Sequence, residues 1–283
     1  MVYRHLPEAE FKDISDRILY EDNHILIINK KVGEIVQGDK TGDECLAETL
    51  KAFIAQRDGK PGNVFMGIPH RLDRPVSGIC MFAKTGKALE RLAAMFRGSD
   101  VHKTYWALCC EKPDPEEGHL EDWLIRNEKQ NKSFVTACIP PAGTGSQGVP
   151  LRGTPSASGY LPLTLPRVAR PWGPVPAGGK SDAKLAKLNY RYLGSTDRYH
   201  LIEVELLTGR HHQIRCQLAH LGCVIKGDLK YGAKRSNPDG GICLHARQIR
   251  FIHPVKKEEM TVIAPLPSTF HVPQSISGHN PSE

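Results

Sequence analysis

A nine-residue stretch, residues 70–78, most constrains how this chain can fold. It contains one carboxylate, Asp73, and three side chains that are or can be cationic: His70, Arg71 and Arg74. Pro75 fixes its own φ and favours an extended residue before it, so Asp73 does not belong to a helix. The apolar run 79–83 follows and predicts a buried strand. The stretch therefore predicts a tight loop that presents Asp73 beside a core strand, where a rigid scaffold can hold a catalytic group. The alternative is a surface aspartate in a salt-bridged loop, which is common and contributes little to stability.

A second stretch rich in basic residues, 207–215, follows a predicted strand. Residues 200–206 alternate in polarity, which is the pattern of a half-buried strand. We expect a helix to begin at Thr208 or Gly209, so that its first N–H groups form an end that attracts anions. Its buried stripe consists of Ile214, Leu218 and Leu221, and its C′ residue is Gly222. Taken alone, the stretch fits a solvated basic helix face equally well.

Two further helices and several strands are predicted from periodicity. The first helix has Thr41 or Asp43 as its N-cap. Its buried face consists of Leu46, Leu50, Phe53 and Ile54. Thr85 caps the other helix, which Gly98 follows, and its inward side chains are Leu89, Leu92 and Phe96. Strands are expected at 18–20, 24–29, 78–84, 101–108, 119–126, 133–138 and 188–193. Residues 1–16 show no strong pattern.

Residues 139–181 differ in composition from the rest of the chain. They are crowded with Pro, Gly and Ser, have almost no acidic side chains and keep no apolar period. We therefore predict a disordered or loosely docked insertion that interrupts one domain. Two roles remain open: a tolerated insertion, or an RNA contact through Arg152, Arg167, Arg170 and Trp172.

Charge and cysteine usage narrow the classes of protein. The formal net charge of +7 suits a polyanion partner without establishing one. No apolar run is long enough to span a bilayer, and no signal peptide is expected. The eight cysteines form no C-x-x-C pair, which indicates reduced thiols and a cytoplasmic protein. The histidine spacings match no common zinc template, so we expect no metal.

Five motifs in order resemble one enzyme family over roughly residues 17–265, outside the insertion. Residues 70–78 resemble the H-R-L-D-x-x-x-S-G signature of the RluA-type RNA pseudouridine synthases. The other similar segments are K-x-Y-x-A at 103–107, T-G-R-x-H-Q-I-R at 208–215, G-D-x-x-Y-G at 227–232, and L-H-A with F-x-H-P at 244–254. Two positions depart from the family pattern: Lys31 replaces a Pro and Gln217 replaces a His.

The resemblance implies RNA uridine isomerisation. Such enzymes detach uracil from C1′, turn it and rejoin it through C5, without redox change or hydrolysis, so no cofactor is implied. Asp73 matches the catalytic aspartate, which either attacks C1′ or removes the C2′ proton. By resemblance, Arg215 pairs with Asp73, Tyr105 stacks on the target base, and Leu244 packs against the base or the tyrosine. Arg71 is expected to enter the space that a flipped nucleotide leaves. By pattern alone, Tyr105 and Leu244 would be core residues.

We therefore expect an α+β fold with a mixed, largely antiparallel sheet, flanking helices and a central cleft. The chain is predicted to be a single catalytic domain with its core at about 17–267 and no separate S4-like domain. The expected partner is RNA, either rRNA or tRNA, and the expected state is a cytoplasmic monomer that binds no membrane. Two alternatives are a non-catalytic RNA-binding protein on the same fold and a hydrolase that uses Asp73 with His70 or His245.

Overall fold

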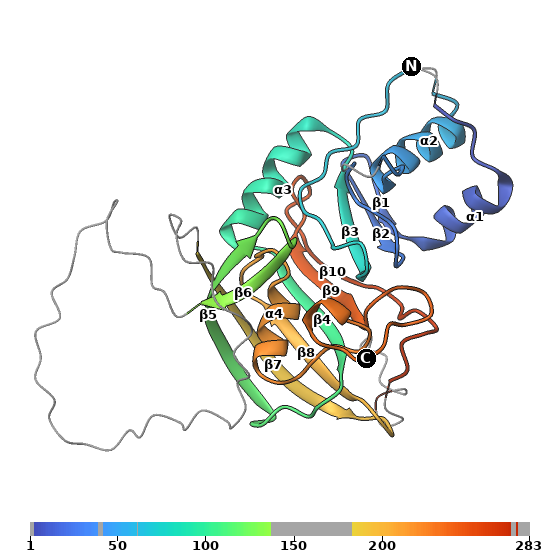
Figure 1. Cartoon of the computed structure of the whole chain (residues 1–283). Helices are drawn as coiled ribbons and strands as arrows, with labels where there is room; N and C mark the ends of the chain where they lie inside the picture. The colour runs from blue at the N-terminus through green and yellow to red at the C-terminus, as the bar shows by residue number, and fades with distance from the viewer. Residues whose placement is uncertain (1–2, 39–41, 61, 137–182, 273–275, 277–283) are drawn as a thin grey trace, which may run out of the picture.

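Ten strands form one mixed sheet in the computed structural model, which describes residues 3–38, 42–60, 62–136, 183–272 and 276 (Figure 1). The strand order is β1-β2-β3-β9-β4-β8-β7-β5-β6, and β10 pairs with β9. The strands are β1 Ile18–Glu21, β2 Ile25–Lys30, β3 Ser77–Ala83, β4 His102–Cys109, β5 Glu117–Asn127, β6 Lys132–Thr136, β7 Lys184–Ser195, β8 His200–Leu206, β9 Leu244–Ile252 and β10 Glu259–Ile263. Among these pairs β3 with β9 is parallel and the others are antiparallel. The predicted α+β fold with a largely antiparallel sheet is confirmed.

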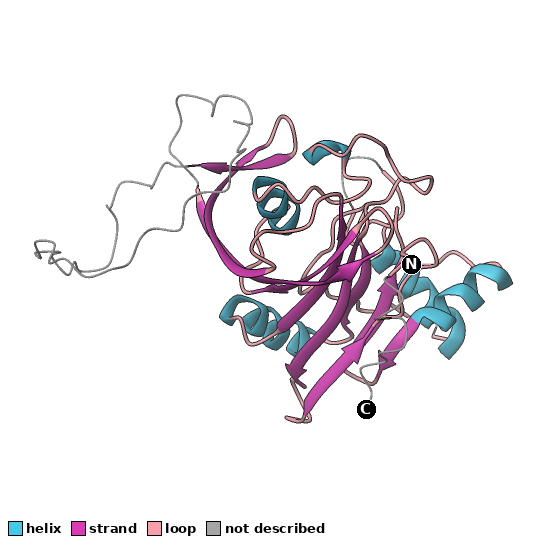
Figure 2. Cartoon of the chain, turned by 90° about the horizontal axis from the view of Figure 1, so that it is seen from below, coloured by secondary structure: helices cyan, strands magenta, loops and turns pink. Residues whose placement is uncertain are grey.

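Helices lie on both sides of this sheet (Figure 2). They are α1 Glu8–Arg17, α2 Leu46–Asp58, α3 Gly86–Gly98 and α4 Gln213–His220, with a 3₁₀ turn η1 at Leu229–Tyr231. Helix α3 begins as predicted, because the Thr85 hydroxyl accepts the N–H of Ala88 at 3.2 Å. It ends at Gly98, and Ser99 is the left-handed C-cap, one residue beyond the predicted stop.

Helix α2 has the predicted buried face but not the predicted cap. Leu46, Leu50, Phe53 and Ile54 are all buried. The N-cap is Cys45, whose side chain makes no capping hydrogen bond. Asp43 lies two residues earlier and pairs with Arg74 at 2.8 Å, and Thr41 is outside the described residues. The prediction failed because the loop carboxylate binds an arginine from a distant segment instead of the helix N–H groups.

Helix α4 begins at Gln213, four to five residues after the predicted start. The Gln213 side chain ties the preceding turn together: its Oε1 accepts the Thr208 hydroxyl at 2.8 Å and the Arg210 N–H at 3.0 Å. Its Nε2 donates to the carbonyl of Lys187 in β7 at 3.0 Å. These side-chain bonds keep residues 208–212 non-helical. The predicted C′ residue, Gly222, does have a positive φ of 94°.

The parallel pair β3–β9 positions the loop that carries Asp73. Strand β3 is buried along its whole length, and Ser77 and Gly78 lie opposite His245 and Ala246. Gly78 has φ +111°, and a Cβ there would lie 2.4 Å from the Ala246 carbonyl oxygen. The missing side chain at Gly78 is therefore what lets the two strands approach and brings the loop beside β9.

Helix α1 was not predicted from the sequence. Its ten residues include only two large apolar side chains, Phe11 and Ile14, which are too few to establish an apolar period. The predicted insertion, 139–181, lies outside the described residues. Within the part of the chain that is described, no helix has both the length and the apolar character needed to cross a membrane.

Candidate active site

A cleft of about 450 Å³ opens between the loop before β3, strand β4, helix α3 and the start of α4. The five residues that the sequence predicted for the site all line it: Arg71, Asp73, Tyr105, Arg215 and Leu244. They come from positions up to 173 residues apart, between Arg71 and Leu244. The sheet therefore gathers the predicted residues into one site.

The described lining of the cleft is strongly basic. Asp73 is its one carboxylate. Six Arg and Lys side chains surround it: Arg71, Arg97, Lys103, Arg126, Arg210 and Arg215. An open cleft with this charge attracts a polyanion and leaves a single acidic group for chemistry.

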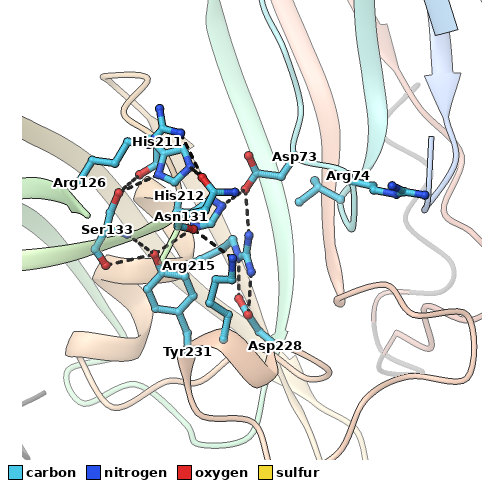
Figure 3. Close-up of polar contacts among 12 residues, drawn as sticks. Asp73, Arg74, Arg126, Asn131, Ser133, His211, His212, Arg215, Asp228 and Tyr231 are labelled. Atoms are coloured by element: carbon cyan, nitrogen blue, oxygen red, sulfur yellow. Dashed lines mark hydrogen bonds and ion pairs between the residues drawn. The ribbon is translucent and has the colours of Figure 1, made fainter. Parts of the chain in front are cut away.

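Asp73 pairs with Arg215 as predicted, but the pair is not bidentate. Nη1 of Arg215 lies 3.1 Å from Oδ2 of Asp73 (Figure 3). The planar fork of Arg215 instead binds Asp228, with distances of 2.7 and 2.8 Å from Nε and Nη2. The Arg215 side chain is 6% exposed and that of Asp228 1%, whereas that of Asp73 is 31% exposed. Asp228 is thus the buried counter-ion, and Asp73 binds Nη1, which Asp228 does not use, and lines the cleft.

The cations next to Asp73 in sequence do not surround it. His70 accepts the Met81 N–H at Nε2 (3.0 Å), and burial lowers its pKa to about 3, so it is neutral. Arg74 points away from Asp73 and pairs with Asp43 (Figure 3). His70 and Arg74 are therefore close to Asp73 in sequence but bind other partners, because neighbouring residues of an extended loop point in different directions.

A buried lysine, Lys30, holds the backbone of the loop that carries Asp73. Lys30, 1% exposed at the end of β2, donates to the carbonyls of Lys31, Arg74 and Val76 at 2.8, 3.2 and 2.7 Å. Burial lowers the pKa of this ammonium to about 8. Two of the three carbonyls, those of Arg74 and Val76, follow Asp73 closely in the chain, so the charge of Lys30 holds the backbone of the loop in place.

Tyr105 and Leu244 form the apolar floor of the cleft. Tyr105 is 8% exposed in β4, opposite Val204 of β8 and Ala246 of β9. Burial, and to a lesser degree Asp73, raises the pKa of its phenol, so the hydroxyl keeps its proton. Leu244 is 3% exposed at the start of β9. Both side chains are buried in the core and also line the cleft, so the two predictions for these positions, core residue and site residue, are compatible.

Two other cleft cations differ in their surroundings. Arg71 is exposed, with a long contact of 3.4 Å to the Gln37 side chain. Lys103 lies over the Phe96 ring, 5.9 Å from its centroid, and burial lowers its pKa. Arg71 is therefore the more exposed of these two cleft cations.

Sequence reasoning gave no role to three residues of the site: Asp228, His212 and Tyr231. Nε2 of His212 lies 3.5 Å from Oδ2 of Asp73, and its Nδ1 lies 3.1 Å from the Tyr231 hydroxyl. A signal for Asp228 was present, because an arginine on a predicted buried helix needs a carboxylate and 227–232 matched a motif. His212 is the histidine of the T-G-R-x-H-Q-I-R motif, but the motif alone did not give it a role. Among the described residues no group of three or more His, Cys, Asp or Glu side chains could hold a metal.

Fold and site together define a class: an α+β protein with an open cationic cleft around one arginine-bound carboxylate, suited to a polyanionic substrate. A family model described as RNA pseudouridylate synthase matches residues 24–220. The chain belongs to this family, and it is a pseudouridine synthase, an isomerase that acts on RNA.

Similar proteins agree with this assignment. The chain is 28% identical to "Pseudouridylate synthase RPUSD4, mitochondrial" of Xenopus tropicalis, over 92% of this chain and 79% of the relative. It is 30% identical to an "Uncharacterized RNA pseudouridine synthase" of Chlorobaculum parvum, over 92% and 74%. Among solved structures, "Human RNA Pseudouridylate Synthase Domain Containing 4" has the same fold, with a TM-score of 0.66 at 24% identity over 93% of both chains.

Proposed function

We propose that Asp73 is the catalytic carboxylate that isomerises uridines in structured rRNA or tRNA. The observation that carries this proposal is the position of Asp73: the one carboxylate of the described cleft lining, held by Arg215 and still 31% exposed. Either role at the sugar, attack on C1′ or removal of the C2′ proton, needs an ionised carboxylate with one oxygen open to substrate.

The other cleft residues have separate roles in this proposal. Arg215 orients Asp73, and Tyr105 offers its ring to the target uracil. Leu244 packs behind the base. The exposed Arg71 side chain enters the space that the target nucleotide leaves when it flips out of its stack. Flipping costs about a few kcal/mol in a duplex and least in a loop. The remaining cations bind phosphates.

The hydrolase alternative loses its proposed partners. His70 uses Nε2 to accept the Met81 N–H and is neutral, so it cannot serve as an acid at neutral pH. His245 is not among the residues that line the cleft, and its Nδ1 is 2.9 Å from the Ser77 hydroxyl. Neither histidine is placed to activate water beside Asp73.

The RNA class is inferred from named relatives. "Ribosomal large subunit pseudouridine synthase C" of Vibrio cholerae is 28% identical over 95% of this chain. "tRNA pseudouridine synthase C" of Vibrio parahaemolyticus is 28% identical over 89%. Both RNA classes therefore remain substrates of this proposal, and a direct comparison of the two decides between them.

We further propose that the protein is a monomer, lies in the cytoplasm and binds no metal. The seven described cysteines are unpaired, which supports a reducing compartment. Four large apolar side chains of the described residues are exposed: Phe65, Leu229, Ile252 and Val255. So few support a monomer, because obligate dimers bury extended apolar surface.

The test is tritium release from RNA labelled at uridine C5, because C5 loses its hydrogen when the new glycosidic bond forms. We expect Asp73→Asn to release none while binding RNA with unchanged affinity. Asp43→Asn, which removes a carboxylate paired with a residue of the same loop, is the matched control and should remain active. Activity in Asp73→Asn would overturn the assignment of Asp73, and free uracil as a product would support a hydrolase.

A further inference from the structure

The two oxygens of the Asp73 carboxylate have different surroundings. Oδ2 lies 3.1 Å from Nη1 of Arg215 and 3.5 Å from Nε2 of His212. Oδ1 has no hydrogen-bond or ion-pair partner among the described residues. Oδ2 therefore has one hydrogen-bond donor and a second nitrogen slightly beyond hydrogen-bond distance, and Oδ1 has neither (Figure 3).

The His212 ring is fixed on its far side as well. Its Nδ1 is 3.1 Å from the Tyr231 hydroxyl, and its face stacks on the His211 ring at 3.8 Å between centroids. His211 is itself held, with Nδ1 2.9 Å from the Ser133 hydroxyl and Nε2 3.1 Å from Asn131 Oδ1. The imidazole beside Asp73 thus has little freedom to turn (Figure 3).

The neighbouring groups determine which nitrogen of the His212 ring carries the proton. The Tyr231 oxygen accepts the Ser133 N–H at 2.9 Å. The phenol proton has two acceptors at 3.1 Å, the Ser133 carbonyl and Nδ1 of His212. Because the Asp73 carboxylate lies 3.5 Å from Nε2, it favours the tautomer with the proton on Nε2, and Nδ1 then accepts the phenol proton. Burial, and then Arg215, lowers the pKa of His212 to about 2, so the ring is neutral and carries one proton. That proton is on Nε2, directed at Asp73.

We propose that His212 is a positioning residue whose Nε2–H holds Oδ2 of Asp73, so that Oδ1 is the oxygen that acts on the ribose. This inference rests on the proposed catalytic role of Asp73. One donor leaves a carboxylate free to swing, whereas a second donor on the same oxygen fixes its plane. Hydrogen bonds of an active site are commonly long without substrate and shorten in the complex, so 3.5 Å is a resting distance.

A purely structural role for His212 makes the opposite prediction about substitutions. His212 has φ 53° and ψ 25°, the left-handed region, at the N-cap of α4. Asn tolerates this backbone conformation better than Gln does. The Gln amide, however, ends near the position of Nε2, whereas the Asn amide ends near Nδ1 and cannot reach Asp73. The two variants therefore separate backbone fit from the hydrogen bond.

The experiment compares His212→Gln and His212→Asn in the full chain, with kcat and KM from tritium release and melting temperature from circular dichroism. We expect His212→Asn to lower kcat by about 10- to 100-fold with little change in KM, while His212→Gln retains clearly more kcat even if it melts lower. If His212→Asn is as active as His212→Gln, or more so, the proposal is wrong.

Tyr231→Phe gives a second test that does not depend on how well Gln fits. It removes the proton donated to Nδ1, so it should lower kcat in the native background and have no further effect on kcat in His212→Asn. An equal loss of kcat in both backgrounds would contradict the proposed hydrogen bonds from Tyr231 to His212 and from His212 to Asp73. The assignment of Asp73 fails separately, through an active Asp73→Asn. An inactive Asp73→Asn beside a fully active His212→Asn overturns this inference alone.

Discussion

Arg215 illustrates how one residue can serve stability and chemistry through two carboxylates. Its fork binds Asp228, whose side chain is 1% exposed, so the guanidinium stays charged and in place whatever happens in the cleft. Its remaining Nη1 reaches Asp73, whose side chain is 31% exposed. Asp73 can therefore change partners during a reaction without leaving a buried charge unpaired.

This difference predicts unequal costs for two identical substitutions. Asp228→Asn leaves the buried Arg215 without its full counter-ion and should lower the free energy of unfolding by about 3–5 kcal/mol. Asp73→Asn removes a half-exposed partner and should lower it by less than about 1 kcal/mol. Urea unfolding of both variants measures this. Similar losses in the two would mean that Asp73 is part of the structural pair.

The positions of the site residues and the Arg215–Asp73 pair were predictable from the motifs, whereas the contacts of Asp228 and His212 were not. The five predicted residues do line one cleft. The sequence does not show that His70 and Arg74, which are close to Asp73 in the chain, bind Met81 and Asp43 instead. The main partner of Asp73 comes from 142 positions along the chain, a distance that no local pattern encodes.

At the scale of elements, the parallel contact between β3 and β9 places the catalytic loop. Strand β3 also pairs antiparallel with β2, so Gly78 is paired on both edges, with Lys30 of β2 and Ala246 of β9. The close approach depends on Gly78, because a Cβ would lie 2.4 Å from Ala246 O and 2.5 Å from Ala246 N. Any side chain there must push β9, and with it Leu244, away from the loop.

We therefore expect Gly78→Ala to lower the free energy of unfolding by about 2–5 kcal/mol, the combined cost of overpacking and a strained φ of +111°. Gly86→Ala is the matched control. A Cβ at Gly86, the first residue of α3, meets nothing within 4 Å, so that variant should be neutral or slightly stabilised. Thermal unfolding of the pair checks this, and equal melting temperatures would show that β9 moves without cost.

Elements with strong periodicity were predicted, and those defined by tertiary contacts were not. The half-buried strand 200–206 and the capped helix after Thr85 follow from local pattern and agree with β8 and α3. Helix α1 has ten residues and only two large apolar side chains, Phe11 and Ile14, so the sequence offers too few positions to define a period. The start of α4 was misplaced because the Gln213 side chain binds Lys187 of β7, a contact visible only in three dimensions.

Over the whole molecule, buried histidines are kept neutral beside a basic cleft. Burial lowers the pKa of His70, His212 and His245 to about 3, 2 and 4, and lowers those of His211 and His253 as well. In the unfolded chain a histidine binds a proton near pH 6.5. Below that pH the unfolded state therefore holds more protons than the folded state.

This imbalance predicts a loss of stability as the pH falls from about 6.5 to about 5, above the range where the carboxylates titrate. The free energy of unfolding should fall by about 1.4 kcal/mol per pH unit for each histidine that stays neutral, a large fraction of a typical total of about 5–15 kcal/mol. His70→Gln should make the free energy of unfolding depend less steeply on pH, by about 1.4 kcal/mol per pH unit, which is the contribution of one histidine. The reason is that an amide oxygen can still accept the Met81 N–H but cannot titrate. Urea unfolding at a series of pH values measures both slopes. If the two slopes are the same, His70 is protonated in the folded chain, and its bond to Met81 is not the one that the structure places there.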